Sequence, residues 1–559
     1  MGKIDYEPIT LKKLKEKFDD REFAIPQIQR KFVWTKKQVC DLMDSIYNHI
    51  PIGVFLTWKT QGTKTAELRP NSNSIIPPFN YSNKYASIII DGQQRLSTIY
   101  GIIKGITPQE DENANIDFTK VYFNTETNNE KKFSYKGNRL SSDYKYVQLT
   151  ELLVNPPNKL SNRYGIKGLR LREIIKCRKQ FLSYKYYSLI IETKNQNEVK
   201  ETFIRVNSKG MTVSSADILF ARTTKIGLRD RITETRRSLK HGFNKINEKV
   251  LISTIALIEG EKSIGQIAID NFEKKFNKSK ITLTDFKKNW KKIYNAFTRA
   301  NDYLADEFKI TSLDLLPSEN IFTMLSLFFY YKDARPSVFQ KTELKKWFWN
   351  TSIGERYSGA NFNRNIKPDI EFIKSLAKGR NTKYQIKDKI DPTELLQKDY
   401  KSRRSTAVRA FFLLLKNKKP RYIDNGEEML MEIHAAISNR RDKHHIFPRN
   451  LLNRNGIKSK WVNSISNICY LASDNNQSFG SKYPVDYLKN YRRKKNFRNS
   501  MISHLIPLNN PSFWTKNLNK AFKDLIKYRG KLILSEFEKL TGVNKNIMFH
   551  KFDGISRIN

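Results

Sequence analysis

The chain has 559 residues, with 102 Lys and Arg residues against 56 Asp and Glu residues, so its formal net charge is +46. This excess favours a polyanionic partner. Hydrophobic residues make up 39% and aromatic residues 12% of the sequence, which is enough for buried cores and excludes disorder as the main state. At this length we expect about two to four domains.

The N-terminal region alternates strand-like and helix-like segments. A capping box at 35–38 precedes apolar residues at helical spacing, which predicts a helix that ends before Pro51. Residues 52–58 (IGVFLTW) and 85–90 are predicted strands. The Asn-, Ser- and Pro-rich residues 61–84 between them indicate a long surface loop.

After about residue 235 the pattern is mostly that of amphipathic helices, until a motif-bearing stretch near residue 440. Residues 378–398 mix Lys, Gly, Asn and Pro, which favours a boundary there. We therefore expect an α+β protein of three parts. These are an α/β domain at 1–230, a helical middle region at 231–395 and a mostly helical domain at 396–559.

The three cysteines and the apolar stretches indicate in which cellular compartment the protein is expected. Cys40, Cys177 and Cys469 are far apart and form no C-x-x-C pair, which argues against a disulfide scaffold or a cysteine zinc site. The longest apolar stretch, at 321–331, is too short to span a bilayer, and the first residues lack the apolar core of a signal peptide. We expect a soluble, cytoplasmic protein.

The segment 88–98 (IIIDGQQRLST) passes from a predicted buried strand to a helix. Free N–H groups and the positive dipole of a helix start favour an anion there, Gly92 lets a ligand approach the backbone, and Arg95 has the geometry to bind phosphate. Asp91 would then hold a metal ion or a sugar hydroxyl. The alternative is that Asp91 is an N-cap with Arg95 as its salt-bridge partner.

Two further segments, 26–34 (PQIQRKFVW) and 203–210 (FIRVNSKG), combine polar and aromatic residues. Taken singly, the first fits a strand edge and the second a helix end closed by Gly210. The presence of both segments together with DGQQR in one chain is harder to explain by structural roles alone. Four polar side chains of the two segments are therefore candidate functional residues: Gln29, Arg30, Arg205 and Asn207.

Together the blocks IPQIQRKFVW, DGQQRLSTI and FIRVNSKGMTVSSADI resemble the signature blocks of the N-terminal domain of GmrSD-type restriction endonucleases, over roughly residues 10–225. The resemblance implies a ParB/sulfiredoxin-like fold that binds and hydrolyses a nucleoside triphosphate, GTP or ATP, and helps to sense modified DNA. By position it implies a nucleotide pocket lined by Gln29, Arg30, Asp91, Gly92, Gln93, Gln94, Arg95, Arg205 and Asn207.

A second constellation begins at the adjacent His444 and His445 in RDKHHIFP and continues in NSISNICYLASDNNQ. The spacing predicts a ββα unit, with HHIF and NICYLA as strands and SDNNQSFGSK opening a helix. Adjacent strand residues point to opposite faces, so the two histidines need different roles, one as a ligand of a divalent ion and the other as a general base. The alternative is a chance pair in a basic loop.

The order D-x-H-H-I-F-P, then Asn, then S-D-N-N resembles an HNH endonuclease of the His-Asn-Asn subclass. The resemblance implies His445 as the general base and Asn467 as the residue that bridges the loop of the motif. Asp442 orients or supplements the site. The implied ligands of Mg²⁺ or Mn²⁺ are His444 and Asn476, with Asn475 as the alternative to Asn476.

Cations and aromatic residues follow the motif directly, in the run 489–498 (KNYRRKKNFR). A charge run is commonly a solvated helix face. Beside a nuclease motif it favours contact with DNA phosphates. The expected DNA-binding residues are Lys482, Arg492, Arg493, Lys494 and Lys495.

We therefore expect a metal-dependent DNA endonuclease, nicking or cleaving, that is regulated by a nucleotide-binding sensor domain and serves modification-dependent restriction in defence against phage. The expected partners are DNA, in plain or modified form, a nucleoside triphosphate, and a second copy of the chain or companion defence proteins. The alternatives are a nucleotide-gated nucleic-acid-binding module without cleavage and an RNase toxin.

Overall fold

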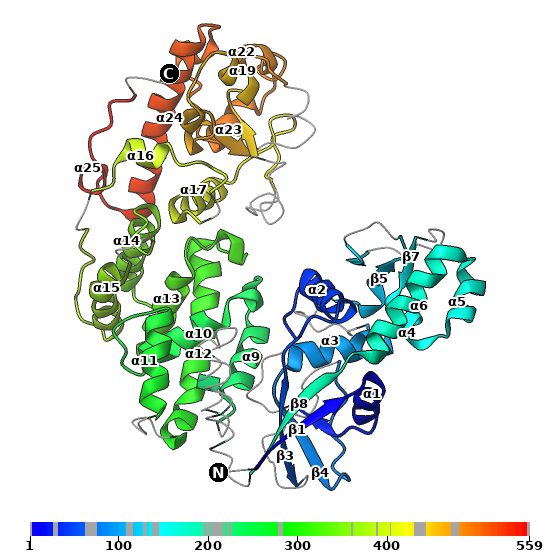
Figure 1. The fold of residues 1–559 in the computed structure, drawn as a ribbon. Coiled ribbons are helices and arrows are strands. Elements are labelled where there is room, and N and C mark those ends of the chain that lie inside the picture. The colour runs from blue at the N-terminus through cyan, green and yellow to red at the C-terminus, as the bar shows by residue number, and fades with distance from the viewer. Residues whose placement is uncertain are drawn as a thin grey trace. The chain divides into compact units, whose positions relative to one another are not determined.

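The computed structural model falls into two compact units, residues 1–227 and 228–559 (Figure 1). The expected boundary near residue 230 lies beside this division, whereas the one near 395 lies inside the second unit, so the three-domain organisation stays a prediction. The structure describes residues 3–25, 32–61, 75–107, 116–126, 131–136, 145–193, 198, 202, 216, 219–220, 223, 226–277, 283–358, 362–386, 389–402, 404–429, 443–470 and 480–555.

A mixed five-stranded sheet organises the first unit, with the strand order β1-β8-β3-β4-β2. The strands are β1 (Lys3–Ile9), β2 (Phe23–Ala24), β3 (Phe55–Gln61), β4 (Tyr85–Asp91) and β8 (Tyr186–Glu192). Strand β3 pairs antiparallel with β4 and parallel with β8. The strands predicted at 52–58 and 85–90 are confirmed, although the first begins three residues later than expected.

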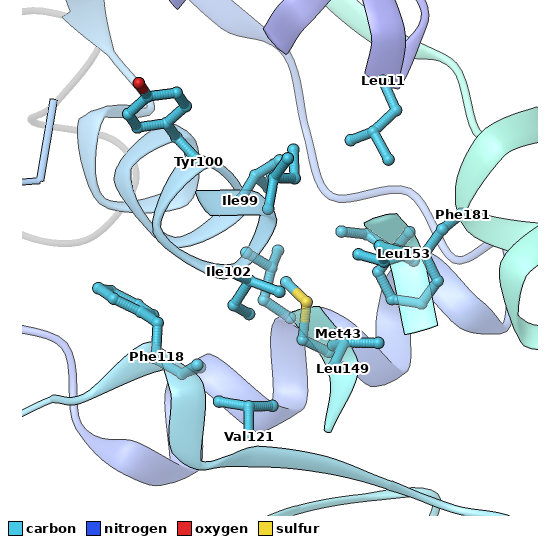
Figure 2. Close-up of a cluster of buried hydrophobic side chains, with 14 of the residues drawn as sticks. Leu11, Met43, Ile99, Tyr100, Ile102, Phe118, Val121, Leu149, Leu153 and Phe181 are labelled. Atoms are coloured by element: carbon cyan, nitrogen blue, oxygen red, sulfur yellow. The ribbon is translucent and has the colours of Figure 1, made fainter. Parts of the chain in front are cut away.

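Helices pack on one face of this sheet and share a core with a smaller antiparallel sheet, β6-β5-β7. Helix α2 begins at the predicted capping box, in which Thr35 and Gln38 bond reciprocally. Figure 2 shows the core that these helices share, with Leu11 from α1, Met43 from α2, Ile102 from α3 and Phe181 from α6. The elements are α1 (Leu11–Asp19), α2 (Lys36–Tyr47), α3 (Gln93–Lys104), β5 (Val121–Asn124), β6 (Phe133–Tyr135), β7 (Tyr146–Gln148), α4 (Leu149–Val154), α5 (Pro157–Tyr164) and α6 (Gly168–Ser183).

The second unit begins with a helical body, as predicted from the 3.6-residue periodicity. Its central helix, α13, is apolar on all sides and almost entirely buried, because α10, α12 and α15 pack around it. The helices are α9 (Leu228–Ser238), α10 (Glu248–Ile258), α11 (Gln266–Asn277), α12 (Leu283–Phe308), α13 (Glu319–Tyr331), α14 (Val338–Ile353), α15 (Phe362–Ala377), α16 (Pro392–Leu396) and α17 (Thr406–Asn417). Within the described ranges, no helix is long and apolar enough to cross a membrane.

The C-terminal part of this unit carries a short two-stranded sheet among helices. Strand β9 (Lys443–His445) pairs antiparallel with β10 (Ile468–Tyr470), and a core that includes Phe447, Trp461 and Phe522 lies beside them. The helical elements are α19 (Arg449–Arg454), α20 (Ser459–Val462), η5 (Ile465–Asn467), α22 (Pro484–Tyr487), α23 (Phe497–Ser503), η6 (Pro511–Trp514), α24 (Leu518–Thr541) and α25 (Lys545–Met548). The predicted α+β class is confirmed.

The predicted ββα unit is found in part. The first strand ends at His445 instead of running through HHIF, because Asn467 takes both main-chain hydrogen bonds of Phe447. The second strand covers ICY. The predicted helix at SDNNQSFGSK falls mostly on 471–479, outside the described residues.

Candidate functional site

The strand-to-helix junction of the DGQQR segment is built around Arg95. Strand β4 ends at Asp91, and Gly92, which has no side chain to cap the helix, is the N-cap of α3 with φ +92°. One Arg95 nitrogen, Nη2, donates to Asp91 Oδ2 at 2.8 Å, and Nη1 donates to the carbonyl oxygen of Ile52. The salt bridge considered as the structural alternative is therefore present, whereas the cap is Gly92 and not Asp91.

The segment before β3 also fixes the Arg95 guanidinium in place. Gly53 has φ +81°, and a Cβ atom at this position would lie 2.6 Å from Arg95 Nη1. The guanidinium carbon lies 5.4 Å from the centre of the Phe55 ring. Tyr184 joins this arrangement, because its hydroxyl donates to the Ile50 carbonyl and accepts from the Ile52 N–H. Sequence reasoning did not identify Gly53, Phe55 or Tyr184.

The two glutamines of the motif have different environments. Gln94 accepts a hydrogen bond from the Val33 N–H at 2.8 Å, so it holds the end of the first signature block. Gln93 is 3% exposed, and neither polar atom of its amide group has a hydrogen-bond partner among the described residues. An unsatisfied buried amide costs about 1–3 kcal/mol. A bound polar group that reaches this position would remove that cost.

The structure thus brings five of the nine predicted pocket residues to one junction: Asp91, Gly92, Gln93, Gln94 and Arg95. The other four, Gln29, Arg30, Arg205 and Asn207, lie outside the described residues. Their place in a nucleotide pocket stays a prediction.

In the second unit, β9 and β10 give His444 and His445 different surroundings. His445 lies opposite Ile468 and His444 opposite Cys469. The His444 side chain is buried and meets the Tyr487 ring edge to face, with 6.1 Å between ring centres. The His445 side chain is half-buried. This contrast is what adjacent positions on a strand produce.

Asn467 ties together the chain on both sides of this pair of strands. It is fully buried, its Oδ1 accepts from the Phe447 N–H at 2.9 Å, and its Nδ2 donates to the carbonyl oxygens of Phe447 and Val462 at 3.1 and 3.0 Å. These three bonds hold the turn that follows His445 against the end of α20. Such contacts are those expected of a loop-bridging residue.

Two residues that sequence reasoning missed contact the His445 imidazole. Its Nε2 lies 3.3 Å from Asn463 Oδ1, and the Tyr400 ring meets it at 90° with 5.4 Å between ring centres. Burial lowers the pKa of His445 to about 4, so the ring is neutral at pH 7. Asn463 precedes the 3-10 turn in NSISN, and no local pattern distinguishes it from a cap residue.

A buried arginine of α24 binds the main chain at the start of β10. Arg529 is fully buried and donates to four carbonyl oxygens, those of Ile465, Ser466, Ile468 and His504, at 2.7 to 3.1 Å. Charge-assisted bonds of this kind fix a segment strongly. Arg529 therefore holds the main chain on both sides of Asn467.

The remaining members of the predicted nuclease centre, Asp442, Asn475 and Asn476, lie outside the described residues. Within the residues that are described, no group of three or more His, Cys, Asp or Glu side chains is arranged to hold a metal ion. Of the predicted metal-binding and catalytic side chains of the motif, the two imidazoles are therefore among the described residues. The set of metal ligands stays a prediction.

The predicted DNA-binding cations are all exposed: Lys482, Arg492, Arg493, Lys494 and Lys495. The run at 489–498 lies largely on turns between α22 and α23, so it is not the helix face considered as an alternative. The Arg492 guanidinium lies 4.3 Å from the centre of the Trp514 ring, and Lys494 Nζ donates to the Asp424 carbonyl.

Comparison with known proteins supports the predicted family resemblance of the first unit. Residues 11–224 match the family model described as "GmrSD restriction endonuclease, N-terminal domain". This match to the N-terminal domain of GmrSD restriction endonucleases is the resemblance that the three motifs predicted. An uncharacterized protein of Methanocaldococcus jannaschii is 23% identical over 96% of this chain and 99% of its own length. The family match supports a restriction-endonuclease-like function, and it leaves the nuclease motif itself untested.

Proposed function

We propose that the protein is a metal-dependent DNA endonuclease, with its nuclease centre on β9 and β10 and a triphosphate-hydrolysing site at the start of α3, that serves modification-dependent restriction of phage DNA. The observation that carries this proposal is the arrangement around His445. Asn467 fixes the turn after the histidine, and Asn463 contacts its ring. The GmrSD domain at 11–224 supports the same reading.

His445 would act as the general base. An amide oxygen only accepts hydrogen bonds, so Asn463 Oδ1 selects the imidazole tautomer with the proton on Nε2. The Nδ1 lone pair then remains to take a proton from the attacking water. The edge of Tyr400 limits rotation of the ring, which keeps this nitrogen in one orientation.

His444 and Asn476, or Asn475 in its place, would hold Mg²⁺ or Mn²⁺. Amide and water oxygens suit these ions, and an imidazole nitrogen can complete the set. When bound, such an ion stabilises the negative charge on the leaving oxygen. The buried His444 on β9, next to His445, suits this role.

The site at the start of α3 would bind the phosphates of a nucleoside triphosphate, ATP or GTP. The positive end of the α3 dipole attracts an anion. Arg95 has five N–H donors, and its bonds to Asp91 and Ile52 hold it in place. Gln93 has an unsatisfied amide beside this position, and Gln29, Arg30, Arg205 and Asn207 would complete the pocket.

A cleavage assay on matched DNA substrates tests this function. Plain, methylated, hydroxymethylated, glucosylated and phosphorothioated duplexes are incubated with Mg²⁺ or Mn²⁺, with and without ATP or GTP. We expect metal-dependent cleavage of at least one modified duplex that changes with the nucleotide. Binding without cleavage would favour a nucleotide-gated binding module, and cleavage of RNA alone would favour an RNase.

A further inference from the structure

Helix α6 carries a line of exposed cations on the first unit. Arg172, Lys176 and Lys179 are all exposed, and their spacing of four and three residues places them on one side of the helix. The opposite side, with Ile174, Cys177 and Phe181, is buried in the core. We call Arg172, Lys176 and Lys179 the α6 stripe. Further cations, Lys167, Arg170 and Lys185, are exposed around it.

Acidic residues do not neutralise this stripe. The one acidic residue in the α6 sequence is Glu173, which is mostly buried and ion-pairs with Lys132 at 3.0 Å. In the described part of the chain, the three stripe residues have no ion pair. The nearest aromatic contact is that of Lys176, whose Nζ lies 5.8 Å from the centre of the Tyr47 ring.

Some exposed lysines on the other helices of this unit form ion pairs. Lys12 on α1 pairs with Glu16 at 4.0 Å, and Lys37 on α2 pairs with Asp41 at 2.6 Å. These are ordinary surface pairs four residues apart. Lys36 on α2 and Lys159 on α5 are exposed and have no ion pair in the described residues. What distinguishes α6 is that three such cations lie in a line on one side of the helix.

We propose that the α6 stripe contacts the phosphate backbone of duplex DNA. The inference rests on the proposed function and deepens it, because it gives the first unit a DNA contact of its own. From Arg172 to Lys179 the helix rises by about 10 Å. A duplex carries one negative charge per about 1.7 Å of its axis, so three separate phosphates lie within reach.

The packing of α6 favours DNA over an anionic membrane as the partner. A helix that lies in a membrane surface buries its apolar side among the lipids. The apolar side of α6 is already buried in the protein core. Leu169, Ile175 and Leu182 are exposed beside the stripe, 63%, 46% and 45%. Leu169 lies on the other side of the stripe from Ile175 and Leu182, so the three do not form a continuous apolar face.

The test measures binding of the full chain to a labelled duplex over a series of salt concentrations, in EDTA so that cleavage does not interfere. The stripe variant is Arg172→Gln/Lys176→Gln/Lys179→Gln. The control is Lys12→Gln/Lys13→Gln/Lys37→Gln, which removes the same charge from exposed lysines that pair with acids. A third variant, Arg172→Lys/Lys176→Arg/Lys179→Arg, keeps the charge.

We expect the slope of log K against log salt to fall by up to about 2.7 in the stripe variant, which is about 0.9 for each lost phosphate contact. Affinity at low salt should fall at least about tenfold, while the control and the charge-keeping variant stay within about twofold of the wild type. An unchanged slope, or equal losses in stripe variant and control, would overturn the proposal. So would a loss of binding to anionic lipid vesicles with DNA binding intact.

These outcomes are separable from failure of the proposed function. If the wild type binds DNA through the stripe but cleaves nothing with Mg²⁺ or Mn²⁺, the nuclease proposal fails and the contact stands. If the wild type cleaves DNA and the stripe variant binds with an unchanged slope, the contact fails and the nuclease proposal stands.

Discussion

Asn463 Oδ1 lies 3.3 Å from His445 Nε2. Asn463 is the first residue after α20, and His445 is the last residue of β9. Because the amide oxygen accepts and does not donate, this contact sets the protonation of the imidazole. It leaves Nδ1 as the basic nitrogen. Asn463 is thus a positioning residue that acts through His445.

The role of Asn463 predicts different results for two substitutions. Asn463→Leu removes the acceptor and should slow single-turnover cleavage about 10-fold to 100-fold, with little change in DNA affinity. Asn463→Asp keeps an acceptor of the same size at the same place and should retain most of the rate. If the Leu and Asp variants cleave equally fast, Asn463 does not select the tautomer.

Arg529 predicts a large effect on stability. Arg529→Met removes the charged donor that four carbonyl oxygens share, and it should lower the free energy of unfolding of the second unit by about 3 kcal/mol. Lys531→Met, an exposed position on the same helix, should change it by less than about 0.5 kcal/mol. Urea unfolding of both variants measures the difference. Equal midpoints would show that Arg529 does not hold β10.

Gly53 predicts a link between backbone conformation and nucleotide binding. Gly53→Ala places a Cβ atom 2.6 Å from Arg95 Nη1 and should weaken binding of the preferred triphosphate at least about tenfold, because Arg95 is displaced. Gly168→Ala is the matched control, since Gly168 also has positive φ but has open space around it. Calorimetric titration with ATP and GTP compares the two. Similar losses in both variants would assign the effect to backbone strain.

The buried His504 predicts acid sensitivity of the second unit. Burial lowers its pKa to about 4, and its Nε2 contacts the Arg421 carbonyl oxygen. The His504 side chain of the unfolded chain takes up a proton near pH 6.5. Between pH 6.5 and 4 the unfolded state therefore binds more protons than the folded state, and stability decreases as the pH is lowered. His504→Gln should reduce the loss between about pH 7 and pH 5 by about 2 kcal/mol. Urea unfolding at both pH values measures this, and identical pH dependence would contradict it.

Local patterns in the sequence predicted much of the fold. The capping box at Thr35 and the strands around 55–61 and 85–91 depend on neighbouring residues, so periodicity and turn chemistry identify them. The same holds for the junction at Gly92, where a strand of isoleucines meets a helix. The end of β9 was less predictable, because the bonds between Asn467 and Phe447, 20 residues apart, determine where it stops.

The supporting residues of both sites were not predictable from the sequence. Arg529 contacts Ile465 across 64 positions of the chain, and Tyr400 contacts His445 from a segment before α17. Gly53 affects Arg95 through a close approach that only the folded backbone reveals. Such contacts depend on tertiary packing, whereas motif recognition depends on residues near one another in sequence.

The central claim is that His445 serves a DNA-cleaving centre. The most direct measurement is the rate at which purified wild type and His445→Ala cleave the preferred modified duplex with Mg²⁺ or Mn²⁺, alongside reactions in EDTA. The account predicts metal-dependent cleavage by the wild type and a loss of at least about 100-fold in the variant, with DNA affinity unchanged. Cleavage by His445→Ala at the wild-type rate, with the EDTA reactions silent, would contradict it.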